Sequence, residues 1–204
     1  MDEIKYVKNV YNNIAEHFNV TRSYEWPWIS NYLNNLEMNS NILDIGCGTG
    51  RNMLKKNLNF TGIDSSIEFI KICLLKGLNV IEGDMCDLPF KNNTYDAIIS
   101  IASFHHLSTN ERRISALKEM YRVLKPGGTI LISIWSLKQP KKTKRKFDKY
   151  GDTIVKWTKY NDIYDRYYYI FKISEITNLF KSCHFKINSH TWDCGNEIFE
   201  LLKC

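Results

Sequence analysis

The stretch that most constrains this chain is residues 41–51, Asn-Ile-Leu-Asp-Ile-Gly-Cys-Gly-Thr-Gly-Arg. Its first half is largely apolar, as expected of a buried parallel strand. Three glycines follow, and they let the backbone turn tightly at the end of the strand and approach a ligand closely. We expect a helix to begin after the loop, with free N–H groups that favour an anionic group. The ligand-facing positions of this loop are Gly46, Cys47, Gly48 and Gly50.

The acids around the loop indicate which ligand it binds. The spacing is G-x-G-x-G after Asp44, whereas dinucleotide-binding loops read G-x-G-x-x-G. Asp44 would repel a pyrophosphate but could hold an ammonium, such as the amino-acid end of S-adenosylmethionine. Asp64 ends the next apolar run, where an acid can accept both hydroxyls of a ribose. A tight turn with no ligand would need only the glycines, so the two acids favour S-adenosylmethionine.

Composition limits the class of protein. The chain has 204 residues, 44% hydrophobic and 25% charged, which suits one globular domain, residues 1–204. It shows no membrane-length apolar run and no N-terminal signal. The six cysteines form no C-x-x-C pair or metal-ligand spacing, which favours a reduced, cytoplasmic protein with no metal of its own. The net charge of +6 is compatible with an anionic partner such as RNA.

The first forty residues read as helical, because apolar residues recur at three- and four-residue steps between Ile4 and Phe18. Arg22 falls in a break between two helices, beside several aromatic residues. Two interpretations remain open for 1–40. The segment is either an ordinary cap over the sheet or a helical lid that aims Arg22 at an anionic substrate.

Residues after Asp64 extend the expected cofactor site. Ser65 or Ser66 can cap a helix that runs to about residue 76, and residues 78–82 read as a third strand. In the loop 83–89, Asp84 can take the adenine amino group while Met85 packs on the ring. Asp84 can equally be an ordinary polar turn residue.

A fourth strand, 95–101, leads into His105 and His106 at the carboxyl edge of the sheet, where ligands bind. Each histidine is either a structural hydrogen-bonding group or a substrate-binding group. Thr109 is expected to cap a helix over 110–124, and residues 129–135 read as a fifth strand.

The last third begins with a run of basic residues, 138–149, in an expected basic loop over 136–165. It is either a solvated loop or a surface that contacts phosphates. The aromatic stretch 164–171 can stack on bases or complete the core. A helix at 174–181 and a hairpin of strands 185–191 and 198–202 follow.

The alternation of strands and helices, with Asp44, the glycine loop, Asp64, Asp84 and a Lys-Pro-Gly-Gly turn at 125–128, resembles a class I S-adenosylmethionine-dependent methyltransferase. That resemblance implies a Rossmann-like α/β fold. Its sheet has seven mostly parallel strands with one antiparallel strand, and helices cover both faces.

A narrower resemblance is to the eukaryotic tRNA wobble-uridine methyltransferases, which esterify 5-carboxymethyluridine in the anticodon loop. It is carried by residues 11–18, 21–22, 26–27, 105–113, 116–117, 122–128, 135 and 166–171. It implies that Arg22 and the His105–His106 pair are essential and that the tRNA anticodon loop is the partner. It also implies a small zinc-binding activator subunit that adds to the edge strand at 78–82. The basic loop is shorter than in that family, and Glu197 stands where the family has a tryptophan.

A carboxylate nucleophile is ionised at neutral pH and needs no general base, only alignment and a cationic clamp. Arg22 offers a bidentate fork for it, and His105 or His106 can donate a hydrogen bond. Three alternatives remain: a methyltransferase of a small carboxylic acid or other metabolite, a non-catalytic binding module of the same fold, and a nicotinamide enzyme. The glycine spacing and Asp44 disfavour the last.

Overall fold

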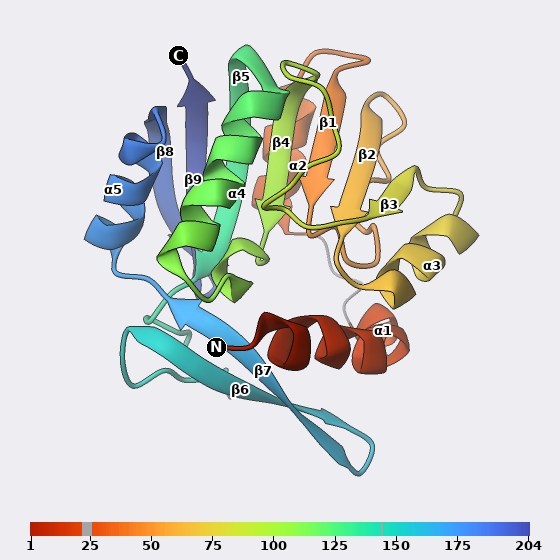
Figure 1. Ribbon diagram of the computed structural model, residues 1–204, viewed down its shortest axis with the longest axis vertical. Helices are drawn as coiled ribbons and strands as arrows, with labels where there is room; N and C mark the ends of the chain where they lie inside the picture. The colour runs from red at the N-terminus through yellow and green to blue at the C-terminus, as the bar shows by residue number, and fades with distance from the viewer. Residues whose placement is uncertain (22–25, 144) are drawn as a thin grey trace.

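A seven-stranded sheet forms the centre of the computed structural model, which describes residues 1–21, 26–143 and 145–204 (Figure 1). Its strand order is β3-β2-β1-β4-β5-β9-β8. Neighbours from β3 to β5 pair in parallel, and β9 pairs antiparallel with both β5 and β8. The predicted mostly parallel sheet with one antiparallel strand is therefore confirmed. The strands are β1 Asn41–Ile45, β2 Asn59–Asp64, β3 Val80–Glu82, β4 Tyr95–Ile101, β5 Leu124–Trp135, β8 Phe185–Asp193 and β9 Asn196–Lys203.

Helices cover both faces of the sheet, as predicted. On one face α4 (Asn110–Val123) and α5 (Ile173–Ser182) pack in the largest apolar cluster, together with Leu43 and Ile45 of β1. On the other face α2 (Pro27–Asn34) packs on Ile42. Phe60 joins the cluster around α2 to the one around α3 (Ile67–Leu75), so α3 shares that face.

Two of the expected helix caps are present. The Ser66 hydroxyl accepts a hydrogen bond from the backbone N–H of Phe69, and the Thr109 hydroxyl accepts one from Arg112. Each cap satisfies an N–H group in the first turn that has no partner within its helix. These caps fix where α3 and α4 begin, directly beside the carboxyl ends of β2 and β4.

Two further layers lie across the carboxyl edge of the sheet (Figure 1). One is α1 (Asn9–Thr21), preceded by a short π-helical segment, η1 (Ile4–Lys8). The other is a two-stranded antiparallel ribbon of β6 (Gly151–Lys159) and β7 (Asp162–Ile170). Trp157 of the ribbon packs on Val10 and Ile14 of α1. The two layers therefore brace each other below the sheet edge where a ligand would bind.

The ribbon corrects the expected basic loop over 136–165, because 151–165 is mostly strand. Residues 153–158 alternate inward and outward, with β-branched residues and Trp157 among them, and this pattern favours a strand. Within the basic run at 138–149 the described residues do form an irregular connection.

The helix expected after the glycine loop is absent, because residues 51–58 form turns. Only eight residues separate Gly50 from the start of β2. That length is too short for the helix that usually crosses between parallel strands. No helix N-terminus therefore supports the loop, and the anion-binding site predicted from one is wrong.

The expected lid over 1–40 is only partly a lid. Its first half, η1 and α1, covers the sheet edge (Figure 1). Its second half, α2, is a core helix whose Ile29 and Leu33 are fully buried against the sheet. In the described part of the chain, no helix is long and apolar enough to cross a bilayer.

Candidate active site

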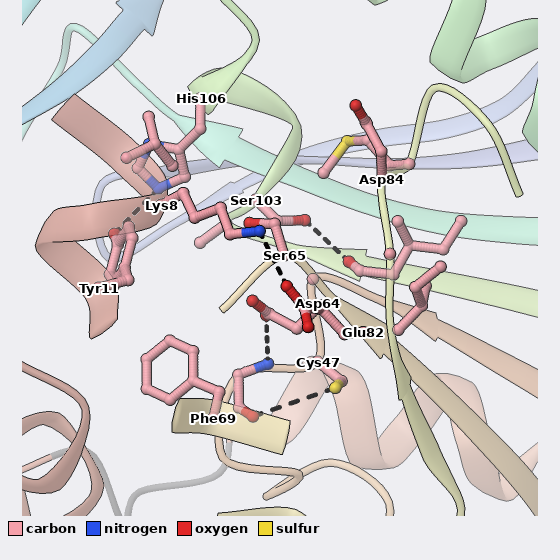
Figure 2. A pocket seen from close by; sticks show the side chains of 18 of the residues that line it. Lys8, Tyr11, Cys47, Asp64, Ser65, Phe69, Glu82, Asp84, Ser103 and His106 are labelled. Atoms are coloured by element: carbon pink, nitrogen blue, oxygen red, sulfur yellow. Dashed lines mark hydrogen bonds and ion pairs between the residues drawn. The ribbon is translucent and has the colours of Figure 1, made fainter. Parts of the chain in front are cut away.

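A cavity of about 650 Å³ opens at the carboxyl ends of β1, β2 and β4, beneath η1 and α1 (Figure 2). Its volume is in the range of small-molecule and cofactor sites. It brings together most of the residues predicted from the sequence: Gly46, Cys47, Gly48, Asp64, Ser65, Asp84, Met85 and His106. Asp44, Gly50 and His105 do not line it. Arg22 lies outside the described residues.

The glycine loop has the backbone that its sequence predicts. Gly46, Gly48 and Gly50 all have positive φ, at 73°, 54° and 72°. A Cβ on Gly46 would lie 2.3 Å from the Ser103 Cβ, so that glycine is required by packing. A Cβ on Gly48 would meet nothing within 4 Å. Gly48 lines the cavity, so its bare backbone leaves a cradle that a side chain would fill.

Asp64 is fixed by the loop that it faces. Its Oδ2 accepts a hydrogen bond from the Gly48 N–H at 2.9 Å, and its Oδ1 accepts one from the Ser66 N–H at 2.9 Å. Burial raises the pKa of Asp64, and the hydrogen bonds from Ser66 and Gly48 oppose that rise. The carboxylate is therefore oriented at the end of β2, where a ribose can reach it (Figure 2).

Asp44 has the least favourable surroundings of the three carboxylates, Asp44, Asp64 and Asp84. Its side chain is fully buried, and neither carboxyl oxygen has a hydrogen-bond partner among the described residues. Burial, then the nearby Asp64 carboxylate, raise the pKa of Asp44 to about 7, while Arg51 and Asn52 oppose the rise. A buried carboxylate without a partner is costly, and an ammonium group would relieve that cost. Together with the cradle at Gly48, this fits the amino-acid end of S-adenosylmethionine.

Asp84 lies on the opposite side of the same cavity. Both its oxygens accept hydrogen bonds from Arg112 Nη2, at 3.0 and 2.8 Å, and Oδ1 also accepts one from the Cys86 N–H. Burial alone would raise the pKa of Asp84, but the bonds from Cys86 and Arg112 outweigh it and lower the pKa. Asp84 is thus an ionised carboxylate already held by a cation.

Four residues that the sequence reasoning missed also line this cavity: Glu3, Lys8, Glu82 and Arg112. Glu3 accepts a hydrogen bond from Arg112 Nε at 2.9 Å, and Lys8 pairs with Glu82 at 2.8 Å (Figure 2). These pairs tie η1 to α4 and to β3 across the mouth of the cavity. No local sequence signal predicts these two ion pairs, because the residues of each pair are 74 or more positions apart in the sequence.

The two histidines have different surroundings. His106 Nδ1 lies 2.7 Å from the Tyr167 carbonyl, so it carries the proton and donates it, and Nε2 accepts a bond from the Tyr11 hydroxyl at 2.9 Å. His105 Nδ1 accepts a bond from the Trp135 N–H at 3.0 Å. Burial lowers the pKa of His106 to about 3 and that of His105 well below its usual value. Both are neutral, and only His106 reaches the cavity.

A second cavity, of about 980 Å³, adjoins the first between α1, the end of β5 and the β6–β7 ribbon. Both cavities are lined by Tyr11, Phe18, Arg51, Ile101 and Ala102. Aromatic rings form much of the second wall, and Trp135 and Tyr168 stack at 4.0 Å between centroids. The described residues that line it include no acid but several cations, namely Arg51, Arg145, Lys146, Lys156 and Arg166.

Arg166 is the most unusual of these cations. It is 5% exposed, and among the described residues it makes no ion pair. Its Nη1 reaches the Tyr11 hydroxyl at 3.5 Å, and its buried Nε has no hydrogen-bond partner in the part of the chain that the structure describes. Its guanidinium lies 4.7 Å from the Trp157 ring centroid and 5.2 Å from that of Tyr168. A buried guanidinium without a counterion is suited to bind an anion.

The fold, the glycine loop and the acids at successive strand ends define this protein as a class I methyltransferase, the class whose methyl donor is S-adenosylmethionine. Residues 43–132 match a family profile described as a methyltransferase domain. The structure superposes on a S-adenosylmethionine-dependent methyltransferase of Methanosarcina mazei with a TM-score of 0.70, at 22% identity, covering 88% of this chain and 98% of that one. It also superposes on a complex of the Haloferax volcanii Trm112 methyltransferase activator with a protein described as a methyltransferase, with a TM-score of 0.71 at 16% identity and 97% of both chains covered.

Sequence relatives narrow the class. The tRNA (carboxymethyluridine(34)-5-O)-methyltransferase of Schizosaccharomyces pombe is 33% identical over 95% of this chain and 94% of its own length. The Arabidopsis thaliana protein of the same name is 46% identical over 67% of this chain, which spans 34% of that protein. The chain therefore belongs to the tRNA (carboxymethyluridine(34)-5-O)-methyltransferase family. It spans about a third of the length of the plant relative.

Proposed function

We propose that this protein transfers a methyl group from S-adenosylmethionine to the carboxylate of 5-carboxymethyluridine at the tRNA wobble position. The product is the methyl ester, 5-methoxycarbonylmethyluridine. The observation that carries the proposal is the buried Arg166, which makes no ion pair among the described residues. It lies in an aromatic cavity beside the donor cavity, and the described residues that line this cavity include no acid. A planar base suits the aromatic walls, and a carboxylate suits the guanidinium.

The donor site follows from the first cavity. Asp44 would face the ammonium of S-adenosylmethionine and Asp64 its ribose, while Asp84 and Met85 would lie by the adenine. The bare backbone at Gly48 lets the donor approach the sheet edge closely. When bound, the donor supplies an electrophilic methyl group on a sulfonium.

The residues of the second cavity would position the acceptor. Its carboxylate is ionised at neutral pH, so no residue has to remove a proton from it. Arg166 would grip the carboxylate and turn one oxygen toward the junction of the two cavities. Tyr11 lies at that junction and is hydrogen-bonded to both Arg166 and His106. Its ring and that of Phe18 exclude water from the path of the transfer, so catalysis here is by alignment and desolvation.

His106 would support this arrangement without acting as a general base. Its Nδ1–H is committed to the Tyr167 carbonyl, and its Nε2 is committed to Tyr11. Since burial lowers the pKa of His106 to about 3, it is neutral at physiological pH. His105 lines neither cavity, whereas His106 lines the first. We therefore assign the supporting role at the substrate to His106 alone.

An activator subunit of the kind named in the Haloferax volcanii complex would dock on the open edge of β3. In the described part of the chain, β3 ends the sheet and pairs only with β2. An edge strand of this kind can accept a further strand from a partner. Leu74 and Leu75, which end α3 just before β3, are 56% and 88% exposed.

The proposal is tested by methylation in vitro, with and without such an activator. The protein is incubated with S-adenosylmethionine and an anticodon stem-loop that carries either 5-carboxymethyluridine or uridine at the wobble position. Nucleosides are then analysed by mass spectrometry. We expect the methyl ester only from the carboxymethylated RNA. A methyl ester formed only on small carboxylic acids, in a parallel arm, would show a metabolite enzyme instead.

Matched variants connect the activity to Arg166. Arg166→Gln removes the charge, and we expect kcat/KM to fall by at least about 100-fold, as the loss of two charged hydrogen bonds implies. Arg166→Lys keeps the charge without the fork and should retain part of the activity. Donor affinity, measured by calorimetry, should stay unchanged in both. A loss of donor binding in Arg166→Gln would show that this arginine is structural.

A further inference from the structure

Arg145 lines the second cavity and does not line the first, where the donor is proposed to bind. Its guanidinium lies 4.1 Å from the ring centroid of Trp135, on a ring that also stacks on Tyr168. Both Arg145 and Arg166 line the second cavity and not the first, but Arg166 also contacts Tyr11, which lines both cavities. The two arginines therefore address different parts of any ligand that fills the cavity.

Gln139 fixes the position of Arg145. Its Oε1 accepts a hydrogen bond from Arg145 Nε at 2.7 Å. Its Nε2 donates to the Ser136 carbonyl at 2.6 Å and to the Gly195 carbonyl at 3.0 Å. The amide thus uses its carbonyl and both of its N–H groups to join β5, the β8–β9 turn and the arginine. A long side chain held in this way loses less conformational freedom when it binds a ligand.

The β8–β9 turn packs closely against Gln139 and Arg145. Gly195 has φ of +83°, and a Cβ there would lie 2.4 Å from Gln139 Oε1 and 2.9 Å from Arg145 Nη2. Any other residue would push the amide and the guanidinium apart. The Gly-Asn turn therefore serves a second purpose besides joining two strands, since it leaves room for Gln139 to hold Arg145.

We infer that Arg145 and Lys146, with Gln139 as the positioning residue, form a phosphodiester-binding subsite for the substrate nucleotide. The inference rests on the proposed function. The reacting carboxylate must lie near the junction of the cavities, which Arg166 reaches through Tyr11. A nucleotide carries a second anion, its backbone phosphate. Arg145 and Lys146 are neighbouring cations that line the second cavity and not the first. Arginine and lysine are the usual protein partners of phosphate.

The test compares acceptors that differ only in phosphate. They are 5-carboxymethyluridine as the free nucleoside, as its 3′,5′-bisphosphate and within an anticodon stem-loop. For the wild type we expect KM to fall when phosphates are added. In Arg145→Ala and Gln139→Leu we expect KM for both phosphorylated acceptors to rise about tenfold, as the loss of one charged hydrogen bond implies, with kcat unchanged. KM for the nucleoside should not move.

A second measurement covers the case in which the free nucleoside reacts too slowly to be followed. Binding of the stem-loop is measured by fluorescence anisotropy over a range of salt concentrations. Each lost phosphate contact lowers the slope of log K against log salt by roughly 0.7 to 1. We expect this change in Arg145→Ala. The control Lys186→Ala removes one exposed charge at the far end of β8 and should leave the slope as it is.

The outcomes separate this inference from the proposed function. If the wild type methylates no carboxymethylated acceptor, the proposed function fails. If the wild type is active but Arg145→Ala loses the nucleoside and the bisphosphate equally, Arg145 binds the carboxylate or the base and the phosphate subsite is wrong. An unchanged salt slope in Arg145→Ala would also overturn it.

Discussion

The Tyr11 hydroxyl donates a hydrogen bond to His106 Nε2 at 2.9 Å, across the junction of the two cavities. The direction is settled by the other ring nitrogen, because the Tyr167 carbonyl can only accept from Nδ1. The Tyr11 oxygen therefore receives bonds from Tyr168 and Arg166, at 3.1 and 3.5 Å. A residue of the N-terminal helix thus orients groups from η2 (Phe104–His106) and from β7.

Tyr11→Phe should weaken both the fold and the transfer. It leaves the buried His106 Nε2 without a partner, which costs roughly 1–3 kcal/mol of unfolding free energy. It also frees Arg166 to move, so kcat should fall more than donor affinity does. Urea denaturation and single-turnover methylation measure the two effects. A variant with normal stability and normal kcat would show that the Tyr11–His106 bond is incidental.

The two neutral histidines should make the protein sensitive to acid. In the unfolded chain each takes up a proton near pH 6.5, whereas in the folded protein the pKa of His106 is about 3. Between these values the unfolded state binds more protons, so the free energy of unfolding falls as the pH drops below 6.5. His106→Asn keeps a donor for the Tyr167 carbonyl but cannot titrate. Its stability should fall less steeply than the wild type between pH 6.5 and 5 in urea denaturation; parallel curves would contradict this assignment.

Asp44 should produce the opposite slope. Its pKa is raised from 3.8 to about 7 in the folded protein, so between these values the folded state holds a proton that the unfolded chain has lost. In the protein without donor, the contribution of Asp44 to the free energy of unfolding is therefore greatest below about pH 4, and it declines as the pH rises through 7. Asp44→Asn removes that decline and should be more stable than the wild type at pH 8, by up to about 4 kcal/mol.

The donor should reverse this relation, because its ammonium favours the ionised form of Asp44. Donor affinity of the wild type should rise between pH 6 and 7.5, while Asp44→Asn should bind weakly with no such rise. Calorimetry at several pH values measures both. An equal pH dependence in the two proteins would place the ammonium elsewhere.

The sequence predicted the fold and the donor cavity because their signals are local. The apolar run before the glycines and the acids at successive strand ends each lie within a few residues of the position they define. The sequence therefore predicts Asp44, Gly48 and Asp64 as cofactor-binding residues, and the structure places Gly48 and Asp64 in the wall of one cavity. The prediction of a helix after Gly50 was wrong, because the eight residues between Gly50 and β2 are too few to form the helix that usually follows such a glycine loop.

The second cavity could not be predicted from local sequence signals, because it forms only where α1, the end of β5 and the β6–β7 ribbon pack together. Arg166 lies in the aromatic stretch 164–171, which the sequence predicts either to stack on bases or to complete the core. The burial of Arg166 becomes apparent only once the β6–β7 ribbon is formed. Arg112 and Glu3 meet over 109 residues of sequence. The significance of Gln139 depends on a turn 56 residues away.

The edge of β3 gives a prediction about assembly. If a small activator adds to this edge, Leu75→Asp should weaken its binding at least tenfold, because a charge replaces an apolar group at the rim of the interface. Met38→Asp is the matched control, since Met38 is 74% exposed but lies before β1, an interior strand that is separated from β3 by β2. Pull-down and calorimetry with the activator measure both. Equal weakening, or none in either variant, would move the interface away from β3.

Two glycines of the loop, Gly46 and Gly48, should respond differently to substitution. Packing requires Gly46, whereas Gly48 leaves room for the ligand. In Gly46→Ala the new Cβ would lie 2.3 Å from Ser103, at a position with positive φ, so the loop itself must shift and the protein should lose several kcal/mol of stability. In Gly48→Ala the Cβ meets no protein atom, so the cost is the roughly 1 kcal/mol of a positive φ. That Cβ does enter the donor cavity, and donor affinity should fall at least tenfold. Thermal unfolding and calorimetry distinguish the two variants. A stable Gly48→Ala protein with full donor affinity would show that the donor does not approach the sheet at this glycine.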